Sequence, residues 1–172
     1  MNCKLTRIDL YPTENQKKEI NNFMGTYRFI YNVLIHNLKH CMFDDGRISS
    51  FHCKRLIDRV EEDERYKWLS KYSYHLMIPS ITALIINVEN FVKDNGRVPS
   101  TKDDIAMLSM KKKEDELRCC CSVPMIQDRD DYVNITGLGM IKSDKHEINT
   151  MGLSQYSILV MSKGKYFLGM YY

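Results

Sequence analysis

The pattern of apolar and polar positions changes twice along the chain. Residues 3–10 alternate between apolar and polar side chains, which predicts a strand that Pro12 ends. Apolar residues then recur at helical spacing as far as Asn95 and Gly96, a pair that ends a helix. Beyond residue 116 the period returns to two. Further strands are predicted there, at residues 117–123, 132–135, 140–141, 156–161 and 166–172.

The middle of the chain is predicted to form several helices. Thr13 followed by Gln16 is a capping box, so the first helix begins there and runs towards Met24, and Gly25 marks a break. Ser49 or Ser50 caps a later helix. The remaining helices carry their apolar residues within residues 30–41, 56–60 and 77–92.

Two segments of the middle region are interpreted differently from these helices. Trp68, the only tryptophan, is expected in the core, where it anchors a short turn together with Leu69. Residues 97–116 are polar and mixed in charge, which is typical of a linker or mobile loop.

The order of the elements predicts an α+β fold, a small antiparallel barrel with helices inserted. An isolated strand at residues 3–10 would leave its backbone groups without hydrogen bonds, so we expect it to pair with the late strands. The predicted domains are the barrel at residues 1–11 and 117–172, the helical lobe at 12–96 and the linker at 97–116.

Length and composition indicate the class of protein. A chain of 172 residues supports one ordinary domain or two small lobes, and 44% hydrophobic with 27% charged residues is typical of a soluble globular protein. The longest apolar segment is interrupted by Pro79, Asn87 and Glu89, so no membrane span is predicted. Because the N-terminus lacks the zones of a signal peptide, we expect a cytoplasmic protein.

The excess of positive charge lies at the N-terminal end. The net charge is +3, and residues 1–40 hold six Lys or Arg against three Asp or Glu. Such a mild excess permits nucleic-acid binding without requiring it.

Neither a metal nor another cofactor is expected. The six cysteines form no CxxC pair, so thiols in a reducing cytosol are favoured over a zinc ribbon. A cluster of carboxylates at Asp128, Asp130 and Asp131 is interpreted as a solvated turn rather than a two-metal site. The alternative to idle thiols is a metal site across a helix hairpin. Its ligands would come from His36, His40, Cys41, His52 and Cys53.

Short motifs in a fixed order resemble the TnpB family. The opening motif is Tyr11-Pro12-Thr13 with Gln16, followed by Gly25, Arg28, Tyr31 and Asn32. Later motifs in the order expected of that family are Trp68-Leu69, Phe91-Val92-Lys93, Gly96-x-x-Pro99-x-x-Lys102, Gly137 to Lys142 and Ser162 to Tyr166.

The resemblance implies a fold and a role. TnpB-like proteins are transposon-associated, RNA-guided DNA nucleases, related to the type V CRISPR effectors. Their oligonucleotide-binding-type barrel, the wedge domain, is interrupted after its first strand by a helical recognition lobe. A RuvC nuclease domain follows in the family. We expect this chain to lack that domain, and therefore to cleave nothing by itself.

The candidate nucleic-acid-binding residues fall into three groups. The first group is a helical stripe of residues spaced by four, four and three positions: Arg28, Asn32, His36 and Lys39. These side chains could contact a phosphate backbone and a base edge, or they could simply form a solvated face. Basic residues on the first strand and the late hairpins could line a groove for a single strand, with Tyr166, Phe167, Tyr171 and Tyr172 as stacking platforms or core residues. The predicted site residues are Lys4, Arg7, Tyr11, Gln16, Arg28, Asn32, His36, Lys39, Lys102, Lys142, Lys163 and Lys165.

Three functions remain as hypotheses at this point. The first is a non-catalytic, regulatory protein that binds a structured or guide-type RNA, with duplex DNA as a further partner. The second is an interaction protein that inhibits or assists a related RNA-guided nuclease, by competing for its RNA or by binding a subunit. The third is a truncated transposase remnant. No membrane partner is expected.

Overall fold

The computed structural model describes residues 5–43, 45–109, 116–121, 131–135, 137–144, 157–162 and 164–171. The chain divides into two compact units. Unit 1 consists of Met1–Gly25 and Lys112–Tyr172, and unit 2 consists of Thr26–Lys111. Each unit has its own core, and each is described separately below.

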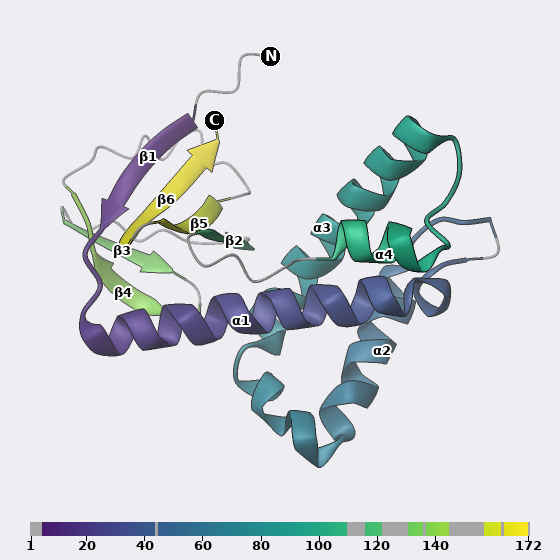
Figure 1. Ribbon diagram of the computed structural model, residues 1–172. Coiled ribbons are helices and arrows are strands. Elements are labelled where there is room, and N and C mark those ends of the chain that lie inside the picture. Colours follow the sequence, from purple (N-terminus) through teal and green to yellow (C-terminus); the bar gives the residue numbers. More distant parts are fainter. Residues whose placement is uncertain are drawn as a thin grey trace. The chain divides into compact units, whose positions relative to one another are not determined.

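Unit 1 is built on two antiparallel sheets. The four-stranded sheet has the order β1-β6-β5-β2, and β3 pairs with β4 in a second sheet. Figure 1 shows β1 and β6 side by side, although they come from opposite ends of the chain. The expected pairing of the first strand with the late strands is therefore confirmed. The strands are β1 (Leu5–Leu10), β2 (Glu116–Cys121), β3 (Tyr132–Ile135), β4 (Gly139–Lys142), β5 (Ser157–Ser162) and β6 (Lys165–Tyr171).

Much of the core of unit 1 lies on one face of β1, β6 and β5. Ile8 is directly opposite Leu168, which is also opposite Leu159, and all three side chains are almost completely buried. The intervening residues face the other way because side chains alternate along a strand. Burial of these apolar residues from β1, β5 and β6 supplies much of the driving force for pairing the two ends of the chain.

The end of β1 also contacts the end of β4. Leu10 forms an isolated antiparallel bridge with Ser143, and the Tyr11 backbone N–H donates to the Lys142 carbonyl at 2.7 Å. Asp144 in turn donates its N–H to the Asp9 carbonyl at 3.1 Å. Strand β1 is thus bordered by β6 along its length and by the β4 end near Leu10. Neither sheet closes on itself within the described residues, so the oligonucleotide-binding-type barrel stays a prediction.

Unit 2 is helical. Its largest fully buried side chains come from four helical elements and include Tyr31, Leu34, Ile57, Leu69 and Leu84. The helical elements are α1 (Glu14–His36), the 3₁₀ helix η1 (Leu38–Cys41), α2 (Ser50–Glu62), the 3₁₀ helix η2 (Glu64–Lys71), α3 (Ser73–Asn95) and α4 (Lys102–Leu108). The first half of α1 belongs to unit 1 and the second half to unit 2.

The expected helix starts are confirmed. The Thr13 N–H donates to Gln16 Oε1 at 2.9 Å and the Gln16 N–H to Thr13 Oγ1 at 3.3 Å, which completes the capping box of α1. Ser49, the first of the two candidate caps, accepts the His52 N–H on its hydroxyl at 3.2 Å and begins α2.

The predicted break at Gly25 is wrong, because α1 continues without interruption from Glu14 to His36. Good helix-forming sequence and buried apolar residues flank the glycine on both sides, including Met24 and Tyr27. The gain from their burial exceeds the helical penalty of a single glycine, which is only about 0.5–1 kcal/mol relative to alanine.

Replacing Gly25 by alanine is therefore expected to raise the free energy of unfolding by about 0.5–1 kcal/mol. A Cβ atom at this position would meet nothing within 4 Å outside its own helix, so alanine fits without strain. Urea denaturation monitored by circular dichroism measures the change. A lower stability than that of the wild type would mean that the chain turns at this glycine in solution.

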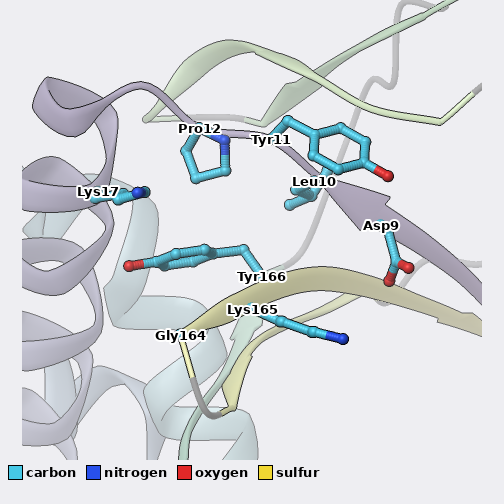
Figure 2. A pocket seen from close by; sticks show the side chains of 8 residues that line it. All are labelled: Asp9, Leu10, Tyr11, Pro12, Lys17, Gly164, Lys165 and Tyr166. Carbon is cyan, nitrogen blue, oxygen red and sulfur yellow. The ribbon is translucent and has the colours of Figure 1, made fainter.

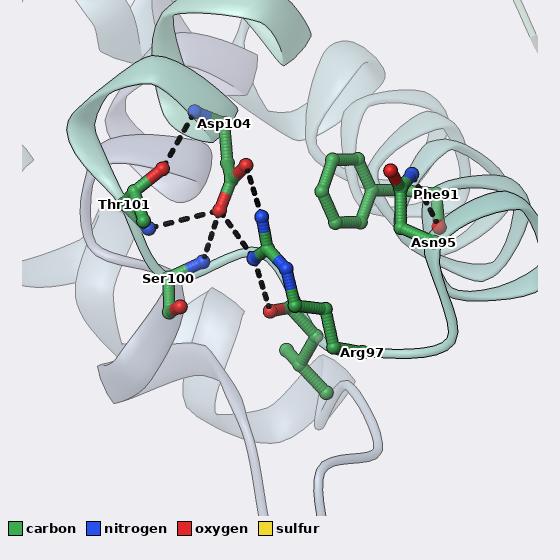
Figure 3. Close-up of polar contacts among 7 residues, drawn as sticks. Phe91, Asn95, Arg97, Ser100, Thr101 and Asp104 are labelled. Atoms are coloured by element: carbon green, nitrogen blue, oxygen red, sulfur yellow. Dashed lines mark hydrogen bonds and ion pairs between the residues drawn. The ribbon is translucent and has the colours of Figure 1, made fainter.

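Part of the expected linker forms a helix, α4. Figure 3 shows how its first turn is held: Asp104 Oδ2 accepts the N–H groups of Ser100 and Thr101 at 3.0 and 2.9 Å, and Thr101 Oγ1 accepts the Asp104 N–H at 3.1 Å. Arg97 donates to both carboxylate oxygens, at 2.6 and 2.9 Å. This capping box fixes a helix of seven residues that is too short to give a clear apolar period.

The prediction that Trp68 lies in the core is also wrong. Its side chain is 49% exposed, and its ring meets the edge of Phe29 with ring centroids 5.2 Å apart. Leu69, the next residue, is the one that is fully buried. In a short 3₁₀ helix adjacent residues point in different directions, so only one of this pair can face the core.

Helix α3 contributes buried residues to the core of unit 2, among them Leu76, Leu84 and Phe91. Tyr31 joins it to other parts of the unit, because its hydroxyl accepts from Asn87 Nδ2 at 2.9 Å and donates to the Leu108 carbonyl at 3.1 Å. By length and composition alone α3 could also cross a membrane, a test that the core helices of soluble proteins pass as well.

Candidate nucleic-acid interface

Two of the predicted residues on and beside β1 are held by carboxylates of the same unit. Arg7 pairs with Asp9, with Nε to Oδ1 at 2.7 Å, and its guanidinium lies 4.1 Å from the centre of the Phe167 ring. Tyr11 is about half exposed and donates its hydroxyl to Asp144 Oδ1 at 2.6 Å. This hydrogen bond to a carboxylate raises the pKa of Tyr11 above its usual value.

Gln16 has a structural role in unit 1. Its side-chain oxygen caps α1, and its Nε2 donates to the Met140 carbonyl at 2.7 Å. The side chain therefore fixes the start of α1 against β4. The oxygen and the nitrogen of this amide are thus each hydrogen-bonded within unit 1.

A cavity of about 370 Å³ opens between the end of β1 and the turn that joins β5 to β6 (Figure 2). We call it the β1–hairpin cavity. Of the predicted site residues it brings together Tyr11 and Lys165. Among the described residues, its lining is Asp9, Leu10, Tyr11, Pro12, Lys17, Gly164, Lys165 and Tyr166.

The walls of this cavity combine cations with apolar and aromatic surface. In Figure 2 the Tyr166 ring lies below Pro12 with its hydroxyl towards Lys17, while Lys165 extends in the other direction, towards Asp9. Tyr166 is buried and Lys165 is exposed. Lys17 Nζ lies 2.6 Å from Glu14 Oε1, and this ion pair raises the pKa of Lys17, which therefore stays an ammonium ion.

Lys142 of β4 is exposed in the same unit and does not line the cavity. Lys4 and Lys163 lie outside the described residues, as do Asp128 and Asp130. Asp131 is described, and its carbonyl accepts the Ser143 N–H at 2.8 Å, next to the paired residues of β3 and β4.

The predicted helical stripe lies in unit 2, on the second half of α1 and on η1. His36 and Lys39 are exposed, whereas Arg28 and Asn32 are half-buried. His36 Nε2 lies 3.3 Å from Ser109 Oγ. One guanidinium nitrogen of Arg28, Nη1, is buried and has no hydrogen-bond partner in the part of the chain that the structure describes.

The four residues of the stripe therefore differ in what they can contact. Asn32 is already engaged within the protein. The exposed His36 of α1 and Lys39 of η1 can meet an acceptor such as phosphate, whereas Nη1 of Arg28 is buried. Lys102, at the first turn of α4, is exposed and belongs to the same unit.

The two cysteines of the helix hairpin are packed inside unit 2, whereas His36 and His40 are exposed. Cys41 and Cys53 are fully buried free thiols, and the Cys41 thiol donates to the Leu34 carbonyl at 3.8 Å. A hydrogen bond between the two thiols, together with burial, raises the pKa of Cys41 above its usual value. Within the described residues no three His, Cys, Asp or Glu side chains come together as a metal-binding group.

Lys17 lines the cavity and is not among the residues predicted from the sequence. It follows the capping residue Gln16 and lies in the first turn of α1, which places its side chain near the end of β1. The capping box gave the start of the helix, and from that start the face of Lys17 could have been derived. Tyr166 was considered as either platform or core, and it is a buried residue that also lines the cavity.

The comparison with known families bears on the first part of the chain. A search of curated proteins found no match. Residues 1–41 match the family model HTH_OrfB_IS605, described as a helix-turn-helix domain. The matched residues comprise β1, α1 and η1. They include seven of the predicted site residues that the structure describes: Arg7, Tyr11, Gln16, Arg28, Asn32, His36 and Lys39. This segment is similar to the N-terminal helix-turn-helix region of OrfB/IS605 transposases, which supports a role in DNA binding.

Proposed function

We propose that the protein binds nucleic acid in a non-catalytic, regulatory role, and that its partners are duplex DNA and a structured, guide-type RNA. The observation that carries the proposal is the match of residues 1–41 to a transposase helix-turn-helix domain. The RNA part rests on the resemblance of the wider set of motifs to RNA-guided nucleases.

The distribution of charge on the described residues supports this function. In unit 2 the exposed His36 of α1 and Lys39 of η1 offer hydrogen-bond donors at the surface. In unit 1 Lys17 and Lys165 line one cavity. Contacts from such groups to phosphates provide affinity and orientation, while base contacts provide specificity.

Fluorescence anisotropy with a labelled DNA duplex and a labelled RNA hairpin tests the proposal directly. The full chain is expected to bind both, with affinity that falls steeply between about 50 mM and about 200 mM salt as counterions are released. Incubation with Mg²⁺ is expected to leave both nucleic acids intact. Absence of binding at the lower salt concentration would refute the proposed function, and cleavage would refute its non-catalytic part.

A matched pair of variants tests the helical stripe. Lys39→Gln is expected to reduce the slope of log affinity against log salt by about one for duplex DNA, because one phosphate contact is lost. Lys93→Gln is the control, since Lys93 is an equally exposed lysine near the end of α3. If the two variants have equal slopes of log affinity against log salt, Lys39 makes no phosphate contact.

The second candidate function is an interaction protein that inhibits or assists a related RNA-guided nuclease. An apolar face of α3 favours it, because Tyr74, Ile78 and Ile86 are largely exposed. Such surface is more typical of a protein contact than of a phosphate backbone. Association with a purified nuclease of this class that survives ribonuclease treatment would support this candidate, and loss of association after that treatment would count against it.

A further inference from the structure

Exposed aromatic rings lie together at the start of α2 in unit 2. Phe51 is 65% exposed and Phe43 is 49% exposed, and the His52 ring is close to both, with centroid distances of 5.9 and 5.4 Å. Folding usually removes phenylalanine rings from water. A group of rings left at the surface indicates a place that another molecule covers. We call this surface the Phe51 patch and define it by Phe43, Arg47, Phe51, His52, Lys54 and Arg55.

The backbone that carries the Phe51 patch is held by hydrogen bonds and by the core. The Phe43 N–H donates to the Arg47 carbonyl at 2.8 Å. Ser49 caps α2 by accepting the His52 N–H, and Cys53 on the inner side of the helix is fully buried. The backbone is therefore fixed before a ligand binds, which lowers the entropic cost of binding.

The charges of the patch favour an anion. Residues 46–57 contain the cations Arg47, Lys54 and Arg55 and no carboxylate. Neither Lys54 nor Arg55 forms an ion pair within the described part of the chain, and the Arg55 guanidinium lies 5.7 Å from the centre of the Phe51 ring. Arg47 pairs with Asp45, but both side chains are exposed and such a pair contributes little to stability.

The carboxylates of α2 are confined to its C-terminal part: Asp58, Glu61 and Glu62. The exposed Arg59 lies among them, so the charge of that part is mixed. Asp58 follows Lys54 by four positions, which is the spacing of helical ion pairs, yet the described residues form no such pair there. Positive charge is thus concentrated in the first turns of α2, where the helix dipole adds to it.

Exposed rings beside unpaired cations fit a nucleic-acid strand whose bases are unpaired. Such a base has a free flat face that stacks on an aromatic side chain, while the neighbouring phosphates attract cations. Because Phe51 stays 65% exposed with Arg55 beside it, a base can reach the ring without displacing the guanidinium. In a duplex the faces of the bases are covered by their neighbours, so only phosphates can meet the patch.

We propose that the Phe51 patch binds an unpaired segment of a single-stranded polynucleotide, with a base stacked on Phe51 and the adjoining phosphates on Lys54 and Arg55. This inference rests on the proposed function and makes it more specific. It adds a site for unpaired strand outside residues 1–41, the segment similar to a helix-turn-helix domain. RNA and DNA share the chemistry that the patch recognises, and the 2′-hydroxyl distinguishes them.

The first test measures the affinity of the full chain for labelled oligo-U RNA, oligo-dT DNA and a DNA duplex. Phe51→Ala is expected to weaken binding of a single strand roughly tenfold through the loss of one stacked base, and to leave duplex binding unchanged. Tyr74→Ala is the control, since it removes another exposed ring of unit 2, on α3, and is expected to change neither affinity. Circular dichroism checks that both variants fold.

The second test concerns the cations. Lys54→Gln is expected to reduce the slope of log affinity against log salt for single strands by about 0.7, because one phosphate contact is lost. Lys93→Gln, at an exposed lysine of α3, is the control and is expected to keep the slope of the wild type. Asp58→Asn removes negative charge one helical turn from Lys54 and is expected to tighten binding. Equal slopes for the two lysine variants, or weaker binding by Asp58→Asn, overturn the assignment of the phosphates.

A fluorescence measurement separates stacking from a structural role of Phe51. Trp68 is the only tryptophan, so Phe51→Trp combined with Trp68→Phe places the single indole in the patch. A base stacked on an indole quenches its emission. Quenching is expected over the same strand concentrations at which anisotropy shows binding. A strand that binds without quenching overturns the site.

The remaining outcomes are distinguishable. Equal effects of Phe51→Ala and Tyr74→Ala on single strands, or binding of duplex without single strands, overturn the patch and leave the proposed function standing. No binding of any nucleic acid by the wild type overturns both. If Phe51→Ala abolishes binding of a purified RNA-guided nuclease but not of single strands, the patch is a protein contact and the inference is overturned. A larger effect of Phe51→Ala on oligo-U supports the site with RNA as its ligand, and a larger effect on oligo-dT supports it with DNA.

Discussion

Replacing Leu168 by alanine is expected to lower the free energy of unfolding of unit 1 by about 2–5 kcal/mol, the usual cost of such a truncation in a core. Leu168 is fully buried in β6 and lies opposite both Ile8 of β1 and Leu159 of β5, so the change opens a cavity where three strands meet. Native-state hydrogen exchange of the β1 amides measures this free energy for unit 1 alone.

The control for this prediction is on the same strand. Lys165→Ala changes an exposed residue of β6 and is expected to shift the free energy of unfolding by no more than about 0.5 kcal/mol. If both variants changed β1 protection equally, burial of Leu168 would not be what holds the two ends of the chain together.

Replacing Asp104 by asparagine is expected to lower the melting temperature by about 5–10 °C, because a capping carboxylate and its ion pair are lost together. The carboxylate is only 9% exposed, and it accepts two hydrogen bonds from Arg97 and two from backbone N–H groups. Differential scanning calorimetry at neutral pH measures the change. Asp103→Asn, at the exposed neighbouring position, is the matched control and is expected to melt close to the wild type.

The same carboxylate makes stability sensitive to acid. The hydrogen bonds from Arg97, followed by those from the Ser100 and Thr101 N–H groups, lower the pKa of Asp104 below its unfolded value of about 3.9. A lowered folded-state pKa contributes stability above about pH 3.9 that is lost as pH falls towards the folded value. The stability difference between the wild type and Asp104→Asn is therefore expected to shrink below that pH. A constant difference down to the acid transition would contradict this assignment.

Much of the fold followed from local signals in the sequence. The capping residues Thr13, Gln16 and Ser49 located two helix starts, because a cap depends on a few adjacent residues. Alternation located the strands, and the need of a lone strand for hydrogen-bond partners predicted that β1 pairs with the C-terminal strands. The closure of the sheets into a barrel depends on long-range geometry, and the described residues leave it a prediction.

The misses arose where tertiary packing outweighed a local preference. Gly25 weakens a helix, but the burial of its neighbours keeps α1 intact. Trp68 is large and apolar, yet the buried residue is Leu69. The start of α4 has a capping box in the sequence, formed by Thr101 and Asp104. Because the surrounding residues are polar, the segment was interpreted as a linker.

The candidate site was predictable only in part. The sequence indicated that β1 and the late hairpin would supply basic residues, and Tyr11 and Lys165 do line one cavity. The sequence did not indicate that the Gln16 side chain would be hydrogen-bonded within the protein. Its partner is the carbonyl of Met140, which is more than a hundred residues away along the chain. The sequence also did not indicate Lys17. Its place in the cavity lining depends on the residues that follow the β5–β6 turn, Gly164 to Tyr166, which line the same cavity.

The pairing of β1 with β6 has a consequence for biosynthesis. The first strand leaves the ribosome long before its neighbour exists, on the order of ten seconds earlier at ordinary rates of translation. The helices of unit 2 contact one another through nearer residues and can fold in that interval. During synthesis the nascent β1 therefore has an open edge, which makes it the segment most in need of a chaperone until the last residues emerge.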